Sequence, residues 1–116
     1  MRHGERVTLL ERGIDKLGRI YSKEDLDKPI IYGTVGLNED VTISAEKISH
    51  TFTDIDVAED GTVTGKLNIL ETQNGKLLTN LLEENCHLNT IIYGVGSYDD
   101  FTRKVSSYRL IRIDIN

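Results

Sequence analysis

The sequence predicts an α+β fold, with a mainly antiparallel β-sheet or barrel-like core and one or two short helices. Alternating apolar and polar residues recur at 46–57, 62–70 and 101–116, as is typical of half-buried strands. Leucines at helical spacing mark 74–85 instead. Because strands dominate and do not alternate strictly with helices, antiparallel pairing is favoured. The length supports one core, so we expect a single domain over residues 1–116.

The first third of the chain predicts two strands around a short helix. Residues 7–13 (VTLLERG) suit a strand, and residues 30–35 (IIYGTV) suit a buried one. Between them, Ser22 is a candidate cap for a short helix, with Asp25 near its third position. Pro29 then ends that helix.

Residues 46–70 predict a β-hairpin. The apolar residues of 46–57 change parity near Thr53, which indicates a β-bulge or a bend there. Residues 58–61 (AEDG) signal a turn. Residues 62–70 (TVTGKLNIL) then return as the second strand.

After the hairpin, the spacing of apolar residues changes to that of a helix. One stripe contains Leu77, Leu78, Leu81 and Leu82. Asn74 is the expected N-cap, and Asn85 is suited to close the helix in a left-handed conformation.

Two segments with strand character follow this helix. Residues 88–97 predict a strand or strand-loop, and 101–116 predict a long final strand with an apolar row at Ile111, Ile113 and Ile115. The basic residues of this last segment alternate with apolar ones, which indicates the solvent side of a strand. They are Arg103, Lys104, Arg109 and Arg112.

The composition excludes several classes of function. A net charge of −5 and a pI of about 5.1 disfavour a nucleic-acid binder, which needs a basic surface. No apolar run approaches the length of a membrane span, and the first residues do not resemble a signal peptide. The single cysteine, Cys86, cannot form an internal disulfide. We therefore expect assembly in the cytoplasm, with neither a nucleic-acid nor a membrane partner.

The residue types alone give no convincing catalytic pair. Cys86 and His87 are sequence neighbours, so their side chains diverge at a helix end. His50 alternates with Ile48 and Phe52 on one strand face, which favours a partly buried packing residue over a general base.

Metal and cofactor sites are not expected either. The three histidines and the cysteine lack ligand spacing, and the acidic clusters lack the pattern of a calcium loop. Residues 94–97 (GVGS) lack the further glycine and the helix start of a nucleotide-binding loop.

Several segments nevertheless resemble the prohead core protease family of tailed bacteriophages. Residues 15–30 (DKLGRIYSKEDLDKPI) are similar to the family's NxNGRxYPxxxLxxAI segment. Residues 65–97 follow its GxxxIL strand, its TxxGKxL helix start and its later GxxxGVSSRGxGS segment. Residues 47–57 and 108–116 look like its RVSHxIxxI strand and its closing ELVTFDVV strand. The resemblance implies a prohead-protease-like fold over nearly the whole chain.

The same resemblance implies that catalytic groups are missing. The family's nucleophile is a serine in SSRG, and Ile91 and Ile92 occupy the two serine positions here. Its base is a histidine in GELxHP, where Leu37 falls, whereas Asp114 matches a family aspartate. An isoleucine has no lone pair with which to attack a carbonyl, so no enzyme activity is expected by this route. The resemblance also implies a truncated relative, since the proteases continue beyond the strand that residues 108–116 resemble.

These features favour a non-catalytic structural virion protein of a tailed phage, located in the capsid as a decoration, cement or minor capsid protein. The expected partners are the major capsid protein, other virion proteins or further copies of this chain. The main alternative is a transient prohead scaffold or a regulatory partner of an active protease. Two less favoured hypotheses are an active endopeptidase that uses Cys86 or Ser97 with His50, and a soluble α+β domain whose likeness to the family is chance.

Aromatic residues are enriched at interface hot spots, so exposed aromatics are the candidates for partner binding. The segment 97–101 (SYDDF) is the expected partner-facing loop. The candidate residues are Tyr93, Tyr98, Asp99, Asp100 and Phe101.

Overall fold

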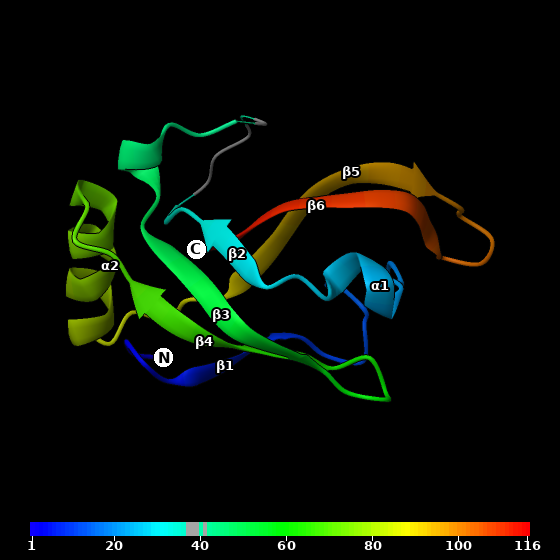
Figure 1. Ribbon diagram of the computed structural model, residues 1–116, viewed down its shortest axis with the longest axis horizontal. Coiled ribbons are helices and arrows are strands. Elements are labelled where there is room, and N and C mark those ends of the chain that lie inside the picture. The colour runs from blue at the N-terminus through cyan, green and yellow to red at the C-terminus, as the bar shows by residue number, and fades with distance from the viewer. Residues whose placement is uncertain (37–39, 41) are drawn as a thin grey trace.

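Two antiparallel sheets make up the β part of the computed structural model, which describes residues 1–36, 40 and 42–116. The larger sheet has the strand order β1-β4-β3-β2. Its strands are β1 (Arg6–Leu10), β2 (Ile30–Gly33), β3 (His50–Val57) and β4 (Val63–Ile69). The strands β5 (Thr90–Tyr98) and β6 (Val105–Ile115) form a separate ribbon that projects from the body as an arm (Figure 1). Antiparallel pairing is confirmed, but neither described sheet closes on itself, so the barrel-like closure is not confirmed.

The helical elements are short and lie at the ends of strands. They are α1 (Lys23–Leu26), the 3-10 helix η1 (Ala45–Lys47) and α2 (Gln73–Glu83). Figure 1 shows α2 and η1 together at the end of the large sheet that lies away from the arm. No helix among the described residues is long and apolar enough to cross a membrane.

The N-cap of α2 is Thr72 rather than Asn74. The Thr72 Oγ1 atom accepts a hydrogen bond from the Gly75 backbone N–H at 3.0 Å. Asn74 lies within the first turn, and its side-chain amide donates to the Lys47 carbonyl at 3.0 Å. The expected closure at Asn85 is confirmed, because this residue has a φ of 58°.

Three other local predictions need correction. Ser22 does precede α1, but its hydroxyl donates to the Asp25 carboxylate rather than capping the backbone. The strand expected to be buried, β2, is half-buried, since Ile30 and Tyr32 face solvent. In α2 the predicted apolar stripe is uneven, because Leu77 is exposed on the solvent side of the helix.

The parity change in the hairpin does mark a β-bulge. The register of β3 against β4 shifts between Thr53 and Asp56, and Asp54 takes a left-handed φ of 53°. The Arg6 guanidinium holds this conformation by donating to the Asp54 carbonyl and carboxylate. Hydrophobic residues on both sides of the bulge can therefore face the core.

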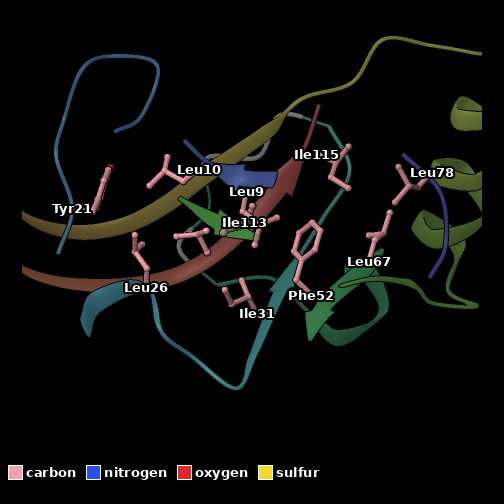
Figure 2. Packing of buried hydrophobic residues seen from close by; sticks show 11 residues of the cluster. Leu9, Leu10, Tyr21, Leu26, Ile31, Phe52, Leu67, Leu78, Ile113 and Ile115 are labelled. Carbon is pink, nitrogen blue, oxygen red and sulfur yellow. The ribbon is translucent and has the colours of Figure 1, made fainter. Parts of the chain in front are cut away.

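The core lies between the large sheet and the base of the arm. Figure 2 shows its side chains converging from both sheets and both α-helices. The buried apolar residues are Leu9, Leu10, Tyr21, Leu26, Ile31, Phe52, Val63, Leu67, Leu78, Ile113 and Ile115. Because two of them come from the end of β6, the base of the arm is anchored in the core.

Backbone contacts also join β6 to the region around β2. The Ile115 N–H donates to the Thr34 carbonyl at 3.1 Å, and the Gly36 N–H donates to the Ile115 carbonyl at 2.8 Å. A side chain on Gly33 would overlap with the Ile113 carbonyl oxygen. Gly33 is thus required by the close approach of two backbones.

Candidate functional site

The two segments that match the protease nucleophile and aspartate lie side by side on the arm. In the β5–β6 register, Ile91 stands opposite Asp114 and Tyr93 stands opposite Arg112. Directly opposite residues of an antiparallel pair have Cβ atoms about 5 Å apart on the same face. Segments some 20 residues apart in sequence therefore meet where the resemblance places a catalytic centre. Leu37, at the position of the family's histidine, lies outside the described residues.

A buried ion pair occupies this centre. The Arg112 Nε atom donates to both carboxylate oxygens of Asp114, at 2.9 and 3.1 Å, and both side chains are almost fully buried. The Asp114 Oδ1 atom also accepts from the Thr34 backbone N–H at 2.9 Å. The Arg112 Nη1 atom donates to the Asp40 carbonyl at 2.6 Å, and the guanidinium carbon lies 4.0 Å from the centre of the Tyr93 ring.

Arg112 is therefore not on the solvent side of a strand, which is where its alternation with apolar residues predicts it to lie. The end of β6 is covered on both faces, so Arg112 and Asp114 are buried along with Ile113 and Ile115. Burial raises the pKa of Asp114, and the hydrogen bonds from Thr34 and Arg112 oppose this rise only in part.

The ion pair limits what Asp114 can do chemically. An aspartate that serves a serine protease accepts a hydrogen bond from the catalytic imidazole and stabilises its charged form. Here the carboxylate already accepts hydrogen bonds from Arg112 and Thr34. Its cross-strand neighbour Ile91 supplies no nucleophilic atom, and Ile92 faces the opposite side of the ribbon. Arg112 and Asp114 thus form a buried ion pair that faces Ile91 across the ribbon.

His50 is a buried packing residue, as its place between apolar neighbours predicts. Its Nε2 atom lies 2.9 Å from the Ile113 carbonyl oxygen, which can only accept, so Nε2 carries the proton. The Nδ1 atom then accepts from the Ser49 hydroxyl at 2.6 Å. The ring also packs edge-to-face against Phe52. Burial lowers the pKa of His50 to about 4, against the opposing effect of the hydrogen bond to Ile113.

The Ser49–His50 contact has the distance of a nucleophile–base pair, but neither side chain is exposed to solvent. No sequence pattern indicates this contact, because a serine next to a histidine on a strand usually points to the opposite face. A substrate has no route to the hydroxyl in this conformation. The contact therefore satisfies two buried polar groups.

The other candidate nucleophiles are not brought to His50. Cys86 is exposed just beyond α2, and Ser97 lies on the exposed half of β5. Both ring nitrogens of His50 are already bonded to Ser49 and Ile113. No group of three or more potential metal ligands gathers among the described residues.

The glycines of the GVGS segment make room for an aromatic ring. A side chain on Gly94 would overlap with the phenol of Tyr108, and one on Gly96 would press against the same residue. The Tyr108 ring packs edge-to-face against Tyr21, with 4.9 Å between the ring centres. Burial raises the pKa of Tyr108 to about 12. These glycines therefore have a packing role in the arm.

The segment that resembles NxNGRxYP forms a compact hydrogen-bond network around Asp15. The Asp15 Oδ2 atom accepts from Arg19 Nε at 2.6 Å and from the Tyr21 hydroxyl at 2.8 Å. The Oδ1 atom accepts from the backbone N–H groups of Leu17 and Arg19. Burial raises the pKa of Asp15, but these hydrogen bonds together outweigh it and hold the pKa below its usual value.

Two cavities lie beside this hydrogen-bond network, and Arg19 and Ile92 line both of them. The larger, of about 440 Å³, lies between the loop after β1 and residues 89–92 at the start of β5. The smaller, of about 240 Å³, continues along β5 towards Tyr98.

The five candidate partner-binding residues occupy different environments. Tyr93 is half-buried beneath Arg112, so only part of its ring is accessible. Tyr98 is 44% exposed, and Phe101, at the tip of the arm, is 99% exposed. The Asp99 carboxylate accepts from the Phe101 N–H and so shapes the turn, and Asp100 beside it is exposed. Their part in binding stays a prediction.

Comparison with known proteins gives a fold relationship. No protein-family model matches the chain, and no curated protein sequence matches it significantly. Among solved structures, the chain is similar to the capsid assembly protease gp21 of bacteriophage T4, with a TM-score of 0.76 and 16% sequence identity. The match covers 95% of this chain and 78% of that one. The chain has a prohead-protease-like fold. This confirms the expected fold, and at this identity the likeness concerns the fold alone.

Proposed function

We propose that this chain is a non-catalytic structural virion protein of a tailed phage, which binds the capsid shell as a decoration, cement or minor capsid protein. The fold is similar to that of a capsid assembly protease of a phage, which supports a role connected with the capsid. Fold alone does not determine function, so the proposal depends on the residues of the site.

The observation that carries the proposal is the ion pair between Arg112 and Asp114, which faces Ile91. In a serine protease these positions must supply a hydroxyl nucleophile and a carboxylate that accepts from a histidine. Here the aliphatic side chain of Ile91 replaces the hydroxyl, and the Arg112 guanidinium is paired with the Asp114 carboxylate. Both changes favour a stable packed face over a reactive centre.

Capsid binding without cleavage follows from how a protease fold recognises its substrates. A protease must bind its substrate as well as cleave it, and much of the binding energy comes from parts of the substrate remote from the reacting bond. A chain that keeps the shape and lacks the nucleophile therefore remains a binding module. The two cavities along β5 leave a recessed surface beside the altered site, which supports such a role.

The deciding experiment is quantitative mass spectrometry of purified proheads and mature particles, with this chain counted per copy of the major capsid protein. A fixed ratio in mature particles is expected. Presence in proheads alone would favour a transient scaffold or a regulator of an active protease. Absence from both particles would refute a structural role in the virion.

A second assay addresses catalysis directly. The purified chain is incubated with the capsid precursor, alongside the variants Cys86→Ala and Ser97→Ala, and products are analysed by mass spectrometry. No cleavage is expected from any of the three. Cleavage that either substitution abolishes would identify an active endopeptidase and overturn the non-catalytic assignment.

A further inference from the structure

The strand β5 has an edge without the usual protection against pairing. Among the described residues, β6 is the only strand that pairs with β5, and no backbone hydrogen bond is seen on the other edge of residues 94–98. Natural edge strands are protected by charged residues, prolines or bulges. From Thr90 to Tyr98 there is neither a charged residue nor a proline, and both register shifts place the extra residue in β6.

The outer half of the arm is held to the body on its β6 side, where the Ile20 N–H donates to the Arg103 carbonyl and the Val105 N–H donates to the Ile20 carbonyl, whereas the outer half of β5 is exposed. Val95 is 45% exposed and Tyr98 is 44% exposed, on opposite faces of β5. A two-stranded ribbon is marginally stable in water, and additional strands are needed for a robust sheet. A further strand along this edge would therefore stabilise the arm.

The two ends of β5 carry complementary features. At the tip, Phe101 is 99% exposed and so contacts almost nothing of its own chain. At the base, residues 89–92 line the cavity of about 440 Å³, together with apolar side chains such as Leu10 and Ile14. In an antiparallel pair of β5 strands, the tip of one copy lies at the base of the other.

The absence of charge favours a second copy of this chain as the occupant. In a two-fold contact the residue on the axis faces its own equivalent, and the residues around it face other residues of the same strand, so a charge on the axis would meet a like charge and charges of one sign along the strand would repel each other. Charged residues make up 28% of this chain, yet β5 has none. A strand of a different protein would not require this neutrality.

We propose that two copies of this chain associate through antiparallel pairing of β5 with β5, about a two-fold axis near Val95. The arms then form one sheet in the order β6-β5-β5-β6. Ile92 of each copy stands opposite Tyr98 of the other, and Gly94 stands opposite Gly96. Phe101 of each copy lies beside Asn89 of the other, at the larger cavity. This association does not depend on binding to a capsid.

Sedimentation equilibrium of the purified chain tests the proposal. A concentration-dependent dimer is expected, and Val95→Lys is expected to raise its dissociation constant at least ~10-fold because two like charges then meet at the axis. The matched variant Val95→Thr keeps a β-branched residue without charge and is expected to retain the dimer. Circular dichroism of both variants checks that the fold is intact.

Three further variants report on the geometry. Phe101→Ser is expected to weaken the dimer without changing the stability of the monomer, since the ring is exposed. In a Cys86→Ala background, Val95→Cys is expected to form a disulfide-linked dimer on mild oxidation, whereas Ser106→Cys on β6 is not. A chain that stays monomeric at all concentrations, or a dimer indifferent to Val95→Lys, would overturn the proposal.

Discussion

The buried imidazole of His50 makes the stability of this protein sensitive to mild acid. The folded state holds His50 neutral, with a pKa of about 4 instead of the usual 6.5, mainly because of burial. Above pH 6.5 neither the folded nor the unfolded state binds the proton. Below it, the unfolded chain takes up a proton that the folded protein does not, so the free energy of unfolding falls as the pH is lowered towards 4.

The magnitude follows from the difference between the two pKa values. A difference of about 2.5 pH units corresponds to about 3 kcal/mol in full. Between pH 7 and pH 5 the loss attributable to His50 is about 2 kcal/mol. Asp114 acts in the opposite sense, because its raised pKa favours proton uptake by the folded state. The contribution of His50 must therefore be measured as a difference from a variant without the imidazole.

Urea unfolding of the wild type and of His50→Gln, followed by far-UV circular dichroism at pH 7, 6 and 5, makes that comparison. Glutamine can donate to the Ile113 carbonyl and accept from Ser49, but it does not titrate. The wild type is expected to lose about 2 kcal/mol more than the variant over this range. Identical pH dependence in the two proteins would refute a buried neutral imidazole at this position.

Three other substitutions have defined expectations. Gly33→Ala is expected to cost about 2 kcal/mol of unfolding free energy, measured by urea unfolding, because its methyl group would displace the Ile113 carbonyl. Arg112→Met is expected to lower the free energy of unfolding by about 4 kcal/mol, because it leaves the Asp114 carboxylate buried without its cationic partner. The double variant Arg112→Met with Asp114→Leu is expected to recover most of this loss. An equal loss in the single and double variants would contradict a structural role for the ion pair. Thr72→Ala removes the helix cap and is expected to lower the melting temperature through a loss of about 1 kcal/mol.

Local patterns predict the elements well where a single periodicity decides them. The bulge near Thr53 follows from a parity change, and the end of α2 at Asn85 follows from a residue suited to a left-handed conformation. The predicted N-cap lies two residues too late, because Thr72 and Asn74 are both good capping residues. A tertiary contact, from Asn74 to the Lys47 carbonyl, decides between them.

The features that local patterns miss depend on contacts between distant segments. Arg112 has the alternation of a solvent-facing residue, but its guanidinium is buried by contacts with Asp114, the Asp40 carbonyl and the Tyr93 ring. Neither of the described sheets closes on itself, and this depends on strand order, which no local pattern encodes. The meeting of Ile91 with Asp114 is accessible only through the resemblance to a known family, since the residues alone carry no signal of that register.

The placement of β6 has a consequence for how the protein is made. Its last residues supply Ile113 and Ile115 to the core and the carbonyl that holds His50 in place. A chain emerging from the ribosome can form the β3–β4 hairpin and α2 early, because their contacts are local. The apolar faces of those elements stay uncovered until β6 has been synthesised. Apolar surface exposed during that interval is prone to aggregation, so completion of β6 is the step that protects it.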